Sequence, residues 1–117
     1  MKTIKNIPIL LALGVTLNAN AQKVSITTEK NASNREAFAA ESLQKKLTNL
    51  GYTIVDKKGE YRISLSQAKD TTGLKKEGFT ISSKGKKINV VGNDGTGVIY
   101  ACNEIADRAR RSGSLNL

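Results

Sequence analysis

The sequence predicts an α+β fold, a two-layer sandwich with two helices on one face of a mixed or antiparallel sheet of about five strands. Five short segments alternate apolar and polar residues with the period of two that a half-buried strand requires. Two longer segments show a helical period instead. Since two helices can cover only one side of a sheet, the other side should be solvated. The expected element order is β-α-β-β-β-β-α.

The first half of the chain predicts a strand over 24–28, a helix, and strands over 52–55 and 61–65. Ser33 and Glu36 have the spacing of a capping box, which starts a helix. The helix should end at Gly51, in the position of a C′ glycine. Its apolar face consists of Ala39, Ala40, Leu43, Leu47 and Leu50.

The second half predicts a β-hairpin followed by a helix. Gly85, between the strands, can take the positive φ of a hairpin turn. Glycines in the loop 92–97 should delay the helix until Val98. This loop could hold an anion on its backbone amides, or its glycines could serve only a sharp strand-to-helix turn. The apolar face of the helix consists of Val98, Ala101, Cys102, Ile105 and Ala109.

Residues 1–21 have the features of a signal peptide. Lys2 and Lys5 precede an apolar run over 7–17, and small residues then lead to a cleavage point before Gln22. The run is too short to span a bilayer. We therefore expect an exported protein, periplasmic or extracellular, that does not span a membrane.

The remaining chain predicts one domain over 22–111 and a tail or linker start over 112–117 with little to hold it. Without Lys2 and Lys5, 17 of the 19 basic residues remain against 10 acidic ones. Such an excess is compatible with binding to nucleic acid, an anionic polysaccharide or a membrane surface, or with an ordinary solvated surface. The basic residues are spread along the chain, which favours a solvated surface, and export argues against nucleic acid. If the charge does serve a partner, an acidic glycan or an acidic face on a neighbouring domain is the better candidate.

Residue types limit the chemistry. The chain has no histidine and a single cysteine, Cys102, on an apolar helix face. A zinc site would lack ligands, and a nucleophile–histidine pair is impossible within this chain. Carboxylates remain for glycoside hydrolysis, which needs two of them across a cleft, but each candidate has a simpler structural role. These candidates are Glu77, Asp94, Glu104 and Asp107. We expect no catalytic, cofactor or metal site.

The stretch 77–111 carries a family resemblance. Its pattern is E-G-F-x-I, then I-x-V-x-G, then D-x-x-G-x-x-Y-A and a helix. The matching residues are Glu77, Gly78, Phe79, Ile81, Ile88, Val90, Gly92, Asp94, Gly97, Tyr100 and Ala101. The chain resembles, over about 24–111, the N-terminal accessory domain of family 20 β-N-acetylhexosaminidases and its counterpart in α-glucuronidases.

The resemblance implies an accessory domain without catalytic residues, whose parent enzyme carries its active site on a following (β/α) barrel. It also implies that the last helix faces this barrel. Tyr100 lies nearly opposite the apolar stripe of that helix; an outward aromatic is a suitable anchor for a partner, and the alternative is a tyrosine that simply lies across the helix edge. The candidate docking residues are Tyr100, Glu104, Asp107 and Arg111. The alternative is a free-standing basic module that binds an acidic glycan or another polyanion.

Overall fold

The computed structural model describes residues 22–117, and the predicted signal peptide lies outside the described residues. The predicted element order is confirmed. The elements are β1 (Lys23–Thr27), α2 (Asn34–Asn49), β2 (Thr53–Val55), β3 (Tyr61–Gln67), β4 (Phe79–Lys84), β5 (Lys87–Gly92) and α3 (Gly95–Ser112). In this part of the chain, no helix is both long and apolar enough to cross a bilayer.

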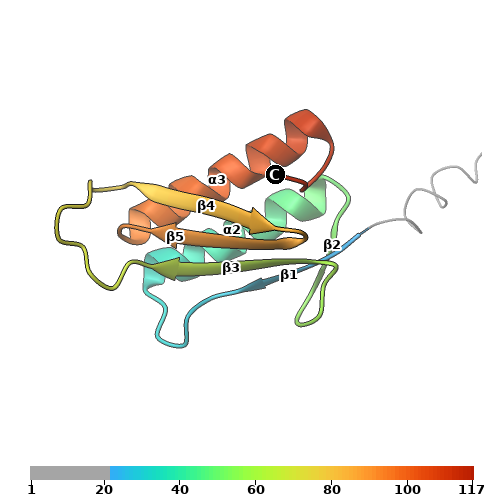
Figure 1. Ribbon diagram of the computed structural model, residues 1–117. Coiled ribbons are helices and arrows are strands. Elements are labelled where there is room, and N and C mark those ends of the chain that lie inside the picture. The colour runs from blue at the N-terminus through green and yellow to red at the C-terminus, as the bar shows by residue number, and fades with distance from the viewer. Residues whose placement is uncertain (1–21) are drawn as a thin grey trace, which may run out of the picture.

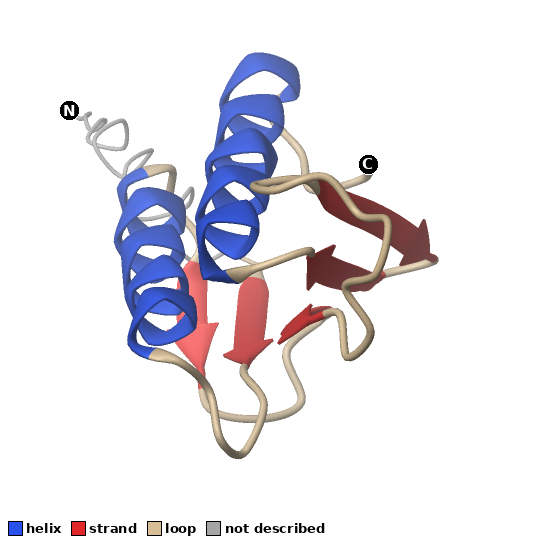
Figure 2. Ribbon diagram, turned by 90° about the vertical axis from the view of Figure 1, so that its left-hand side faces the viewer, coloured by secondary structure: helices blue, strands red, loops and turns tan. Residues whose placement is uncertain are grey.

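The five strands form one mixed sheet in the order β2-β1-β3-β5-β4 (Figure 1). β1 pairs in parallel with both β2 and β3, and β3 pairs in parallel with β5. Only β4 runs antiparallel to its neighbour, because it forms a hairpin with β5. Both helices lie side by side on one face of this sheet, and they leave its other face uncovered within residues 22–117 (Figure 2). The predicted two-layer sandwich is confirmed.

The core lies between the sheet and the helices, and it uses the apolar faces that the sequence predicted. The predicted helix residues in the core are Ala39, Ala40, Leu43, Leu47, Val98, Ala101, Cys102, Ile105 and Ala109, and Ala106 joins them. The strands contribute Val24, Tyr61, Ile63, Leu65, Ile88 and Val90. Leu50 is an exception: it is 39% exposed because α2 has ended at Asn49 and Gly51 turns the chain away with a φ of +100°.

The start of α2 departs from the predicted capping box. Ser33 is the N-cap, and its Oγ accepts a hydrogen bond from the amide of Glu36 at 3.1 Å. The carboxylate of Glu36 does not return to Ser33. It is fully buried and accepts from the amide of Glu29 at 3.0 Å instead. Glu36 therefore joins the loop after β1 to the helix, which a local motif could not indicate.

The last helix begins earlier than predicted. α3 starts at Gly95, so Gly95 and Gly97 lie in its first turn. Asp94 is the N-cap, and its Oδ1 accepts from the amide of Gly97 at 2.8 Å. A β carbon at Gly97 would collide with the carbonyl oxygen of Gly78. These glycines thus permit close packing of a helix start, rather than interrupting regular structure.

The expectation that the chain after the last helix has little to hold it is wrong. α3 ends at Gly113, whose φ is +75° and whose amide donates to the carbonyl of Ala109. Leu115 is then buried in the core. The phenol of Tyr61 donates to Asn116 Oδ1 at 2.9 Å, and Ser83 Oγ donates to the carbonyl of Leu117 at 3.1 Å. A single apolar residue after the helix anchors this segment.

Candidate functional site

The outer face of α3 carries the predicted docking residues in one stripe. Tyr100, Glu104, Asp107 and Arg111 follow each other at spacings of four, three and four, which places them on one side of a helix. Tyr100 is 45% exposed. The opposite side of the same helix is buried against the sheet. The stripe is therefore presented outward by the packing of the helix.

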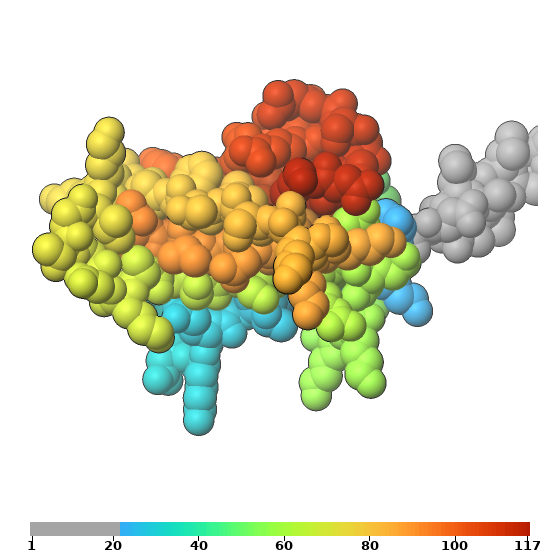
Figure 3. All heavy atoms as spheres, in the orientation of Figure 1, coloured from blue at the N-terminus to red at the C-terminus, as the bar shows by residue number. Residues whose placement is uncertain are grey.

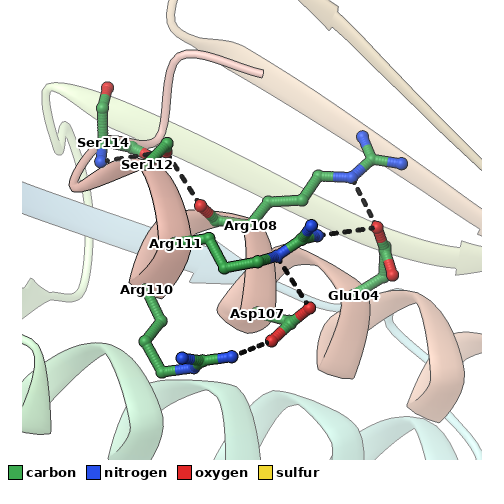
Figure 4. A network of polar contacts seen from close by, with 7 residues as sticks. All are labelled: Glu104, Asp107, Arg108, Arg110, Arg111, Ser112 and Ser114. Atoms are coloured by element: carbon green, nitrogen blue, oxygen red, sulfur yellow. Dashed lines mark hydrogen bonds and ion pairs between the residues drawn. The ribbon is translucent and has the colours of Figure 1, made fainter.

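Charges on this stripe are paired with neighbours on the same helix (Figure 4). Glu104 Oε2 lies 2.7 Å from Arg108 Nε and 3.9 Å from an Arg111 nitrogen. Asp107 contacts Arg110 at 2.6 Å and Arg111 at 3.0 Å. The hydrogen bond from Arg110 lowers the pKa of Asp107, and the charge of Arg111 adds to this effect. Arg111 bridges both carboxylates, so the stripe and its neighbouring arginines are nearly balanced in charge.

A hollow of about 390 Å³ lies beside the stripe, between the end of α2 and the middle of α3. Its apolar wall comes from Leu50 and Ala106. Lys46 Nζ closes one side with a hydrogen bond of 2.8 Å to Asn103 Oδ1. The helix layer also exposes Phe38, whose side chain is 56% accessible. Three of the five exposed large apolar side chains of residues 22–117 thus belong to this layer: Phe38, Leu50 and Tyr100.

Asp94 is one of the carboxylates considered for catalysis, and both of its oxygens accept hydrogen bonds from backbone amides. Its second oxygen, Oδ2, accepts from the amide of Glu77 at 3.0 Å. These backbone bonds, first that from Glu77 and then that from Gly97, lower its pKa. The carboxylate of Asp94 also occupies the helix N-terminus where the loop 92–97 could have held an external anion. The glycine-rich loop therefore has a structural role: it lets Asp94 join the start of α3 to the chain before β4.

Cys102 behaves as the sequence predicted. It is buried in the core, and burial raises the pKa of its thiol to about 12. A thiol in this state is not a nucleophile at neutral pH. Within residues 22–117, no group of three or more His, Cys, Asp or Glu side chains could hold a metal ion.

The sequence did not indicate a polar cluster around the buried Glu36 at the start of α2. Glu36 Oε1 accepts from Gln67 Nε2 at 3.3 Å, and that nitrogen also donates to Ser33 Oγ at 2.9 Å. Glu29 Oε2 accepts from the amide of Gln67 at 3.1 Å. Burial raises the pKa of Glu36, and the neighbouring Glu29 carboxylate adds to this. The hydrogen bonds of Gln67 join β3 to the loop and helix after β1, and the Glu29 amide joins that loop to Glu36, so the role of the cluster is structural.

A match to a family model shows to which protein family the chain belongs. Glycosyl hydrolase family 20, domain 2, matches residues 11–112, which is most of the sequence. The chain belongs to this domain family. The resemblance to the family 20 accessory domain is confirmed.

One solved structure extends the relationship of this family 20 domain to another class of enzyme. It is described as a GH138 enzyme targeting pectin rhamnogalacturonan II, and it matches with 36% sequence identity and a TM-score of 0.73. The match covers 81% of this chain but only 14% of that enzyme. No match was found among curated proteins. The chain thus spans about one seventh of the length of that GH138 enzyme.

Proposed function

We propose that this family 20 domain is the exported, non-catalytic support of a glycoside hydrolase and docks through α3 onto a catalytic barrel. The observation that carries the proposal is the partial match: a chain of this size corresponds to 14% of a GH138 enzyme, and its own family is a numbered domain of family 20. One domain type accompanying two hydrolase families implies that the chemistry lies elsewhere in each enzyme.

The outer stripe of α3 supports docking on this side. Tyr100 offers a large, amphipathic contact, and aromatic residues and arginine are typical anchors at interfaces. The ion pairs of Glu104 and Asp107 hold the arginines in place before a partner arrives. A preorganised surface loses less side-chain entropy on binding. The hollow lined by Leu50 and Ala106 can accept an apolar side chain of the barrel.

The first test is to read the coding DNA beyond the codon for Leu117. An in-frame barrel with an acidic catalytic pair is the expected result. A stop codon with no such reading frame downstream would contradict docking within one polypeptide. The purified chain should also fail to cleave aryl glycosides, and appreciable turnover would overturn the support role.

Docking is tested in the intact enzyme with Tyr100→Ser, and Leu74→Ser is the matched control. Both side chains have nearly the same exposure, 45% and 44%, but Leu74 lies in the loop before β4. Loss of an interface anchor costs on the order of 1–2 kcal/mol. We expect Tyr100→Ser to accelerate amide exchange along α3 and to lower the melting temperature of the barrel. Equal effects of the two variants would count against this interface.

Export is proposed from residues 1–21 alone, and it rests on the basic start, the apolar run and the small residues before Gln22. The mature protein should be recovered outside the cytoplasm with Gln22 as its first residue. Recovery from the cytoplasm with Met1 or Lys2 at the N-terminus would contradict it.

A further inference from the structure

We propose that the uncovered face of the sheet binds a carboxylated polysaccharide at a row of three cations, Arg62, Lys87 and Lys84. We name these three side chains the basic row. They lie on the adjacent strands β3, β5 and β4, where Arg62 pairs with Lys87 and Lys87 pairs with Lys84 in the strand register. Neighbouring strands are about 5 Å apart, so three positive charges stand in line across the sheet.

The basic row points away from the helices. Ile63 and Ile88, the next residues along β3 and β5, are buried in the core. Because successive side chains of a strand point to opposite faces, Arg62 and Lys87 lie on the uncovered face. Lys84 shares that face as the direct partner of Lys87. This is the face seen in Figure 3, where the turn between β4 and β5 projects from the surface.

The same side chains line an open hollow of about 440 Å³, together with Glu60 and Lys86. Lys86 has partners of its own: its ammonium group lies 3.7 Å from Glu60 and 5.4 Å from the centre of the Tyr61 ring. Within residues 22–117, no carboxylate forms an ion pair with a member of the basic row. The hollow therefore has three cations without an ion-pair partner in residues 22–117, of which Arg62 donates from Nε to the carbonyl of Gly59 at 3.4 Å, and one carboxylate that pairs with Lys86.

This arrangement costs stability. Like charges directly opposite each other in an antiparallel pair repel, and Arg62 adds a third on the other side of Lys87. A lysine on an edge strand can prevent aggregation between sheets, which would account for Lys84. It does not account for Lys87 and Arg62, because β5 and β3 are inner strands. An anion that bridges the strands compensates all three charges.

The next rows on this face identify the kind of anion. Ser64, Asn89 and Ser82 lie opposite one another on the same three strands, one step beyond the basic row. Thr27 continues this row on β1 as the partner of Ser64. Hydroxyl and amide groups hydrogen-bond to sugar hydroxyls as donors and acceptors. Cations next to a row of hydroxyl and amide side chains fit a polymer that carries both carboxylates and hydroxyls.

Other polyanions fit less well. Single-stranded nucleic acids bind to proteins by stacking bases on aromatic side chains as well as by charge. On the uncovered face, β3, β5 and β4 present no aromatic residue. Their side chains on this face are Arg62, Ser64 and Ser66 on β3, Lys87, Asn89 and Val91 on β5, and Lys84, Ser82 and Thr80 on β4. A neutral sugar would also lack a stacking platform here. Charge must therefore supply most of the affinity, and binding should weaken as salt rises.

The basic row is independent of the support role. The helices and the basic row lie on opposite faces of the sheet, so a barrel docked on α3 leaves the row accessible. The row would hold the polymer while a catalytic domain acts on it. Each proposal can fail without affecting the other.

The test uses the purified chain and unesterified polygalacturonate at low salt, with the fully methyl-esterified polymer as the neutral control. Lys84→Gln/Lys87→Gln removes two charges of the row. Lys45→Gln/Lys75→Gln removes two exposed charges from α2 and from the loop before β4, so net charge is matched. We expect the row variant to lose at least about tenfold in affinity and the control variant less than about threefold.

The salt dependence provides a second readout. Each charge neutralised on binding adds a little less than one to the slope of log affinity against log salt, so the row variant should have a shallower slope by between about one and two. Equal loss in both variants would overturn the assignment to this row. Equal binding of the methyl-esterified polymer, tighter binding of a single-stranded polynucleotide, or no binding at low salt would each overturn the ligand class.

Discussion

The outer face of α3 and the basic row on the sheet use the same kinds of residue in opposite ways. On α3, acidic and basic side chains follow each other at spacings of three and four, and each carboxylate has an arginine partner. On the sheet, Arg62, Lys87 and Lys84 stand in line with no carboxylate between them. The first surface is compensated before anything binds, whereas the second one is not.

The difference follows from the geometry of the two elements. A helix places residues of one segment next to each other, so a single stretch of sequence can balance its own charges. A row across a sheet collects residues from segments far apart in the chain, and its charge depends on which strands become neighbours. A compensated surface suits a protein partner, since little charge must be desolvated. An uncompensated row suits a polyanion.

The largest expected effect comes from Gly97→Ala, which disturbs the packing of α3 on the sheet. The new β carbon would collide with the carbonyl of Gly78, and α3 would have to move away from the sheet. Overpacking of this kind costs about 2–3 kcal/mol, which lowers the melting temperature by about 10 °C or more in a domain of this size. Thermal unfolding followed by circular dichroism measures it.

Thr96→Ala is the control for this variant. It removes only an exposed hydrogen bond of 3.2 Å from Arg35 and should change the free energy of unfolding by less than about 1 kcal/mol. If Gly97→Ala were as stable as Thr96→Ala, the close approach of the helix start to Gly78 would not be a requirement of the fold.

A second prediction concerns the buried carboxylate of Glu36, which belongs to neither surface. The pKa of Glu36 is raised above its ordinary value of 4.5. Between pH 4.5 and the folded-state pKa, the folded protein keeps a proton that the unfolded chain has released. This contribution to stability is therefore complete below pH 4.5 and is lost as the pH rises through the folded-state pKa.

Glu36→Gln should flatten this part of the pH profile and narrow the stability difference between acidic and neutral conditions. The amide keeps an acceptor for the Glu29 N–H and introduces no charge. Urea unfolding from about pH 4 to about pH 7 gives the comparison, and Glu41→Gln, an exposed position on α2, is the control. Parallel profiles for wild type and Glu36→Gln would show that the buried carboxylate does not control the pH dependence.

The smallest effects provide the most direct test of the comparison, because their signs should differ. Glu104→Gln removes the partner of Arg108 and Arg111 and should lower the free energy of unfolding by about 0.2–1 kcal/mol. Lys84→Gln removes a repulsion across the hairpin and should raise it by a few tenths of a kcal/mol. Urea unfolding at low salt measures both.

High salt should reduce both of these differences, since the charges are exposed. Destabilisation by Lys84→Gln would mean that the basic row is already compensated in the free protein. The anion proposal would then lose its energetic argument.

Local patterns in the sequence predicted the elements and their buried faces well. Alternation in the strands and the helical period identified the core because burial on one face has a fixed spacing. The errors lie where distant segments meet. Gly95 and Gly97 suggested a loop, but Asp94 caps a helix that includes both glycines. Nothing in the sequence indicated that Leu115 would be buried in the core. The partner of Glu36 was also beyond the reach of a local motif.

The sequence by itself determined the order of the elements, the two apolar helix faces, the stripe from Tyr100 to Arg111 and the family, because each depends on spacing within one segment. Only the tertiary structure decided which segments became neighbours. Strand order brought Arg62 beside Lys84 and Lys87, although it lies more than twenty residues earlier in the chain. Basic residues that are scattered in the sequence became one charged row because hydrogen bonding between strands, rather than proximity along the chain, sets which side chains share a surface.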